Sequence, residues 1–189
     1  MTNAQDSLKE FESQGKTEEP SQQKEGVSNP TIKLHNSDGT NTGLFVVGKF
    51  LCAKSVVKDT AQGKRTYMFV DMVLEKTNAV ATLKDGAKYK EVPVKSGDIV
   101  TLYAASRLFN AATKLSPGSR LYAAYTGGII QKGKMVHSHV VKSLPGTLTP
   151  AEAEYIASKN RKKEAAVDAA KSKSEEDKQA ADAMGQLED

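Results

Sequence analysis

The sequence has few of the residues that mark secreted and membrane proteins. It contains one cysteine, Cys52, no tryptophan and three histidines among 189 residues. A single cysteine excludes an internal disulfide, and a reducing compartment fits this usage. No apolar run approaches the roughly 20 residues that a membrane-spanning helix needs. The polar stretch from Met1 to Pro20 lacks the apolar region of a signal peptide, so we expect a cytoplasmic protein that binds no membrane.

Patterns typical of catalysis and metal binding are also missing. The chain has neither a glycine-rich phosphate loop nor a Gly-x-Ser-x-Gly elbow. His137 and His139 have a spacing that two metal ligands can use, but no cysteine or acid lies near enough in sequence to complete a site. His35 lies apart from them, in a polar region. We therefore predict a protein that is not an enzyme and holds no metal or cofactor.

Charge is distributed unevenly along the chain. Residues 1–42 and residues 146–189 each carry a net charge of −3, whereas residues 43–145 carry +10, from 16 Lys/Arg against 6 Asp/Glu. A strongly basic block attracts polyanions, and nucleic acid is the commonest polyanion in a cell. The alternative is a lysine-rich surface that serves solubility alone.

Composition predicts structured and disordered segments at the same boundaries. Residues 1–42 are polar and cannot bury enough apolar surface to offset chain entropy, so we expect them to be mostly disordered. Residues 146–171 should form a helix, because Thr149 and Pro150 provide an N-cap and a first helical residue. Residues 172–189 form an acidic tail that we expect to be disordered.

The middle segment, residues 43–145, alternates strand-like stretches with turns. Six or seven short strands, at most one short helix near residues 106–118, and no βαβ alternation predict a small antiparallel barrel or sandwich. A long first strand interrupted by Gly48 favours a five-stranded Greek-key barrel of the OB type. An immunoglobulin-like sandwich is the alternative, but its cysteine and tryptophan hallmarks are missing.

The stretch Lys64–Glu75 carries the clearest pattern in the chain. Its even positions are apolar, namely Met68, Val70, Met72 and Leu74, and its odd positions begin with Arg65, Tyr67 and Phe69. Because alternate side chains of a strand point to opposite faces, one face should join the core while the other presents a cation and two rings. Such a face can stack unpaired bases and bind phosphates, although the rings could instead pack beneath a loop or a second layer.

Rings and cations interleave in the same way on later strands, with Lys49 and Lys54 on the first. The candidate nucleic-acid-binding residues are Lys49, Lys54, Lys64, Arg65, Tyr67, Phe69, Lys84, Lys88, Tyr89, Lys90, Tyr103, Arg107, Arg120 and Tyr122. Because a register slip of one residue moves a side chain to the other face, some of these rings could belong to the core.

A basic OB-like barrel followed by a flexible acidic tail resembles the single-stranded-DNA-binding proteins of bacteria, phages and plasmids. The resemblance covers about residues 43–145 and the tail, and it rests on layout rather than on a motif. It implies a protein that coats or protects single-stranded DNA in replication or repair, and it leaves room for a homo-oligomer. In bacterial members a hydrophobic tip on the tail recruits replication and recombination proteins. This chain ends in Met184-Gly185-Gln186-Leu187-Glu188-Asp189 without the Pro-Phe tip, so competition of the tail with DNA is the better expectation.

Two other functions remain open from the sequence. The same fold could bind RNA through the same rings and cations. The β domain could instead be a structural or assembly module that binds a protein partner, in which case its rings should form one apolar patch with few cations around it.

Overall fold

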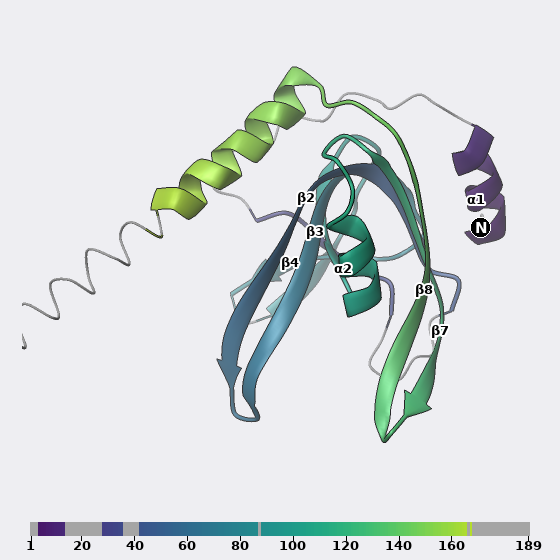
Figure 1. Cartoon of the computed structure of the whole chain (residues 1–189), viewed down its shortest axis with the longest axis vertical. Coiled ribbons are helices and arrows are strands. Elements are labelled where there is room, and N and C mark those ends of the chain that lie inside the picture. Colours follow the sequence, from purple (N-terminus) through teal and green to yellow (C-terminus); the bar gives the residue numbers. More distant parts are fainter. Residues whose placement is uncertain (1–3, 14–27, 36–41, 87, 166, 168–189) are drawn as a thin grey trace, which may run out of the picture. The chain divides into compact units, whose positions relative to one another are not determined.

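The structure is a computed structural model that describes residues 4–13, 28–35, 42–86, 88–165 and 167 (Figure 1). The chain divides into two compact units, residues 1–149 and residues 150–189. Among the described residues, every strand belongs to the first unit, and the second unit contains one helix.

The first unit contains one sheet of eight strands in the order β5-β4-β1-β6-β3-β2-β7-β8. The strands are β1 (Thr31–Lys33), β2 (Phe45–Thr60), β3 (Gly63–Thr77), β4 (Ala81–Asp85), β5 (Lys88–Val92), β6 (Ile99–Tyr103), β7 (Arg120–Gln131) and β8 (Lys134–Leu144). Neighbouring strands pair antiparallel except β1 and β6, which run parallel. The predicted mainly β fold with antiparallel pairing is confirmed.

The described strands do not close into the barrel that the sequence predicted. β5 and β8 are the two ends of the hydrogen-bonded order, with no pairing between them. The edge of β6 that closure would use is already paired with β1, and Thr101 N–H also donates to the Pro30 carbonyl at 2.8 Å. β1 thus takes up the backbone hydrogen bonds of this edge of β6 and is held there by Ile32, which is fully buried. β8 therefore cannot pair with β6 and remains an edge strand.

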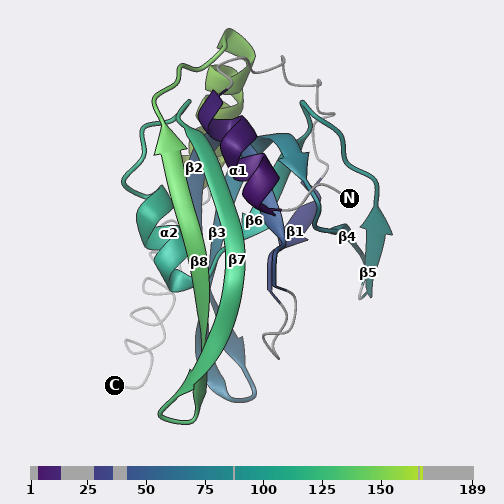
Figure 2. The ribbon, with the colours of Figure 1, turned by 90° about the vertical axis from the view of Figure 1, so that its right-hand side faces the viewer.

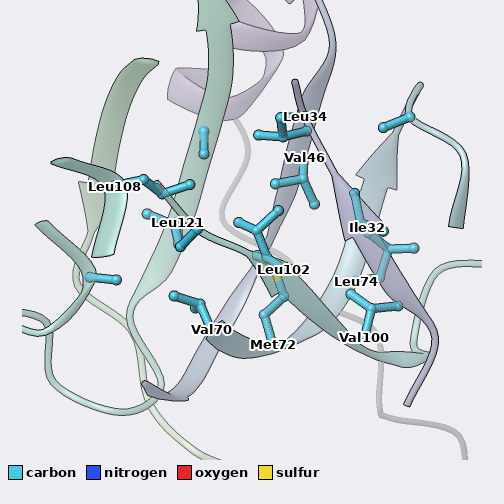
Figure 3. Close-up of a cluster of buried hydrophobic side chains, with 14 of the residues drawn as sticks. Ile32, Leu34, Val46, Val70, Met72, Leu74, Val100, Leu102, Leu108 and Leu121 are labelled. Carbon is cyan, nitrogen blue, oxygen red and sulfur yellow. The ribbon is translucent and has the colours of Figure 1, made fainter. Parts of the chain in front are cut away.

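The main core lies on one face of the sheet, and the alternation predicted for Lys64–Glu75 is what builds its centre. Val70, Met72 and Leu74 of β3 are at most 2 % exposed, and Met68 packs against the same cluster. Figure 3 shows Val70, Met72 and Leu74 meeting apolar residues of β1, β2, β6 and β7.

Two irregularities bend the long β2–β3 ribbon. The register between the strands shifts between Val47 and Gly48 and again between Phe50 and Cys52. Gly48 is required at the first, because a Cβ there would overlap the carbonyl oxygen of Val73. Extra residues of this kind increase the twist of a strand, which lets β2 pair with β3 along its length and with β7 at its start.

Residues 106–118, for which the sequence left a helix or a loop open, contain helix α2 (Ser106–Ala112). Leu108 and Ala112 are fully buried in the main core. α2 therefore packs on the core side of the sheet, against β2, β3 and β8.

The N-terminal segment contributes more structure than its composition predicted. Helix α1 (Ala4–Ser13) and β1 both lie within residues 1–42, while residues 1–3, 14–27 and 36–41 are outside the described part. α1 lies against β7 on the face opposite the main core (Figure 2). Its Phe11 is 1 % exposed and belongs to a second apolar cluster with Phe45, Val47, Tyr122 and Ala124.

In the second unit a helix covers residues 150–165 and begins at Pro150, where the sequence placed its start. The predicted C-terminal helix is confirmed over these residues. The predicted end of the helix at residue 171 and the acidic tail of residues 172–189 are outside the described residues. None of the described helices is long and apolar enough to cross a membrane.

Candidate nucleic-acid interface

Three aromatic rings from two neighbouring strands lie together on the face of the sheet opposite the main core. Phe69 of β3 is directly opposite Tyr103 of β6 in the register. Their ring centroids are 5.8 Å apart in an edge-to-face arrangement, and the Tyr67 ring lies 6.4 Å from the Tyr103 ring. All three side chains are partly exposed. Tyr67 and Phe69 therefore lie on an accessible face, as the alternation predicted, side by side with a third ring.

Cations surround these rings. Lys33 Nζ lies 5.5 Å from the Tyr103 ring centroid, and Lys58 Nζ lies 5.8 Å from that of Tyr67. Lys58 is paired in register with Arg65, so both side chains share the face with the rings. We call Lys33, Lys54, Lys58, Arg65, Tyr67, Phe69 and Tyr103 the ring-and-cation face.

A buried carboxylate supports this face from within the sheet. Asp71 is fully buried and accepts hydrogen bonds from Thr101 Oγ1 at 2.6 Å and from Lys54 Nζ at 2.9 and 3.2 Å. The Cys52 thiol lies 3.8 Å from the same carboxylate. Because a buried carboxylate needs partners of this kind, the Asp71–Lys54 pair fixes where the Lys54 ammonium lies. Asp71 thus acts as the buried partner of a lysine.

The β4–β5 hairpin continues the same face in part. Thr31 of β1 pairs with Thr82 of β4, so Lys84, two residues further along β4, shares the face, and Tyr89 is its register partner on β5. Tyr89 is 67 % exposed. Lys88 and Lys90 flank Tyr89 and therefore point to the other side of the hairpin.

Two further candidates lie away from the rings. Lys64 is exposed at the end of the β2–β3 ribbon, on the opposite side of β3 from Arg65. Arg107 is exposed in the first turn of α2, on the core side of the sheet.

Three candidates are not open to a ligand, and α1 covers two of them, Tyr122 and Arg120. Tyr122 is 2 % exposed and donates a hydrogen bond to the Ala4 carbonyl at 2.8 Å, and Lys49 is 7 % exposed. Arg120 donates to Glu75 Oε2 at 2.6 Å and to the Phe11 carbonyl at 2.9 Å. The expectation that these side chains are open to a ligand is therefore wrong for the structure as it stands, because α1 lies over Tyr122 and Arg120 and because Lys49 is buried.

Lys33 and Lys58 were missed by sequence reasoning. Lys58 has the same parity as Lys54 on β2, and this signal could have found it. Lys33 lies in the segment predicted to be disordered, and no local pattern pairs it with Tyr103, 70 residues away in the chain.

The three histidines form a cluster that the sequence did not predict. The His35 ring lies 3.9 Å from His137 and 5.4 Å from His139, between centroids, and Tyr125 donates to or accepts from His137 Nδ1 at 3.2 Å. Burial and the neighbouring His137 lower the pKa of both His35 and His139 to about 4. In the described part of the chain, no group of three or more His, Cys, Asp or Glu has an arrangement that could hold a metal ion.

Comparison of this chain with protein-family models, with curated proteins and with solved structures finds no match. The ring-and-cation face is therefore the feature of the molecule that points to a function.

Proposed function

We propose that this chain is a non-enzymatic, sequence-tolerant binder of single-stranded nucleic acid, with DNA as the preferred strand. One observation carries the proposal: the register of β3 against β6 gathers Tyr67, Phe69 and Tyr103 on one accessible face, with cations from β1, β2 and β3 beside them. Unpaired bases stack on such rings whatever their sequence, and the cations bind the phosphates between them.

The cations around the rings also argue against a protein-binding patch. An apolar protein interface is depleted of lysine at its centre, whereas Lys33 and Lys58 lie over the rings of this face. The +10 charge of residues 43–145 acts in the same direction, because it attracts a polyanion over the whole unit.

The strand order supports a Greek-key, OB-like origin for the sheet. β6, β3, β2 and β7 are neighbours in the sheet. With the β4–β5 hairpin set aside as an insertion between β3 and β6, this is the spatial order of a Greek key. A short helix, α2, separates β6 from β7. We infer a variant of the OB type in which β1 takes the place beside β6, and on this basis we extend the resemblance to single-stranded-DNA-binding proteins.

The proposal is tested by titrating labelled oligo-dT with the full chain at two salt concentrations. If Lys33, Lys58 and Arg65 each bind one phosphate, a fourfold rise in salt should weaken binding roughly 20-fold. Each phosphate contact on a single strand contributes about −0.7 to the slope of log K against log salt concentration. The double variant Tyr67→Leu, Phe69→Leu keeps apolar bulk but removes two π-faces, and should lose at least about tenfold in affinity.

Matched control variants distinguish binding at the ring-and-cation face from attraction by the overall positive charge. Lys58→Ala should weaken binding, whereas Lys114→Ala, which removes an exposed lysine after α2, should leave it nearly unchanged. A matched RNA oligonucleotide and a DNA duplex complete the set. If RNA binds more tightly than DNA, the ligand is RNA and not DNA. If the chain binds neither strand at low salt, the proposal is refuted.

A further inference from the structure

The face beneath α1 is a continuation of the ring-and-cation face. Lys54 is opposite Phe69 in the β2–β3 register and Lys49 is opposite Val73, and these two β3 residues have the same parity. The bulge at Leu51 keeps Lys49 and Lys54 on one side of β2. The same side of the sheet then passes under α1, where Phe45 and Val47 are buried.

This covered region has the same chemistry as the open one. The rings of Phe45 and Tyr122 are nearly parallel, at 16° and 6.3 Å between centroids. Three cations border them: Arg120 beside Tyr122 on β7, Lys76 on β3 and Lys142 on β8. Rings bordered by cations are suited to bases and phosphates, as on the open face.

α1 presents carboxylates and a ring to this region. Glu10 Oε2 accepts a hydrogen bond from Lys76 Nζ at 2.5 Å, and Glu12 pairs with Lys142. Phe11 lies 5.8 Å from the Tyr122 ring, with the Arg120 guanidinium 4.7 Å from its centroid. Two anions and a ring of α1 thus contact the cations and the Tyr122 ring of this region.

α1 is attached to the sheet by weak, exposed ion pairs and by one strongly buried side chain. The two ion pairs are exposed, with between 37 and 50 % of each side chain accessible, and pairs of this kind contribute little stability in water. Phe11, which is buried, is the main apolar anchor of a helix only ten residues long. A helix of this length is held by its packing rather than by its own propensity.

We infer that the region beneath α1 is a second stretch of the nucleic-acid path, which α1 occupies as an internal competitor. The inference depends on the proposed function, because the ligand is the same single strand. A nucleic-acid strand that leaves the ring-and-cation face along β2 meets α1. Displacing the helix frees Lys76 and Lys142 for its phosphates and uncovers the Arg120–Glu75 pair. With α1 in place, the apparent affinity equals the intrinsic affinity multiplied by the fraction of chains whose face is open.

The test uses the full chain with Phe11→Ala, which removes the anchor of α1 and leaves its charges in place. Binding of a long oligo-dT should become about three- to tenfold tighter, because a larger fraction of the face is open. Glu10→Gln with Glu12→Gln should act in the same direction, more weakly. Circular dichroism confirms that the sheet remains folded in each variant.

A double-mutant cycle tests whether the region beneath α1 binds nucleic acid or is only covered by the helix. Lys142→Gln should weaken oligo-dT binding in the Phe11→Ala background and have little effect when α1 is in place. Equal affinity of Phe11→Ala and the parent chain, or no effect of Lys142→Gln in either background, would overturn the inference while leaving the proposed function intact. If neither chain binds any single strand, the proposed function itself has failed.

Discussion

Acidification should destabilise the fold through the histidine cluster, with His139 as the main contributor. His139 is 5 % exposed, and the backbone of His137 is the neighbouring group that favours its protonated form. It faces His35, His137 and Tyr125, and the positive charge of Arg107 also opposes its protonation. Burial and these neighbours lower its pKa from 6.5 to about 4.

The sign and size of the effect follow from these two pKa values. In the unfolded chain His139 takes up a proton near pH 6.5, whereas the folded chain resists until about pH 4. The stability that depends on neutral His139 is therefore fully present about one pH unit above 6.5 and falls as the pH drops from there to about 4. The full loss approaches about 3 kcal/mol, of which about 2 kcal/mol is reached by about pH 5. His35 acts in the same direction, but it is partly exposed and contributes less.

The measurement is urea denaturation followed by circular dichroism at about pH 8, 7, 6 and 5, on the parent chain and on His139→Gln. The variant should lose most of the pH dependence between pH 7 and 5, whatever its stability at pH 8. Tyr125→Phe is the control, because it removes the hydroxyl beside His137 but keeps all three histidines. Burial raises the pKa of Glu75, which opposes the histidine effect as the pH falls, so the difference between parent and variant is the quantity to compare. An equal pH dependence in parent and His139→Gln would refute the reasoning.

Three stability predictions concern the sheet and can be checked by the same denaturation assay near pH 7. Leu102→Ala should cost about 2–5 kcal/mol, because a fully buried core side chain is removed and leaves a cavity. Gly48→Ala should cost at least about 1 kcal/mol, because the new Cβ overlaps the Val73 carbonyl and the neighbouring strand must shift. Asp71→Leu should remove the only described acid bound to Lys54 and, through the lost hydrogen bonds, lower stability by about 1–3 kcal/mol. Unchanged unfolding free energies for any of these variants would contradict the packing described for that position.

Much of the sheet could be predicted from the sequence, because the information lies in local alternation. Met68, Val70, Met72 and Leu74 recur with a period of two, which is sufficient to make Lys64–Glu75 a strand with one core face. The same alternation placed Tyr67 and Phe69 on the other face, and the structure agrees. The helix that begins at Pro150 could be predicted for a similar reason, since its start signals are adjacent in the chain.

The contents of the candidate site depended on contacts between distant segments. Tyr103 joins Phe69 only through the β3–β6 register, and Lys33 joins Tyr103 only because β1 pairs with β6. His35 meets His137 and His139 across about a hundred residues of chain. No pattern along the sequence reports such pairings.

Tyr122 shows most clearly which properties the sequence determines and which the tertiary structure decides. Its neighbours on β7 alternate as a strand should, so the sequence determined that Tyr122 lies on the opposite face from Leu121 and Ala123. Whether that face is open or covered depends on α1, whose ten residues are more than a hundred positions away. Alternation determines which way a side chain points, because it follows from backbone geometry. What the side chain meets there is decided by tertiary packing.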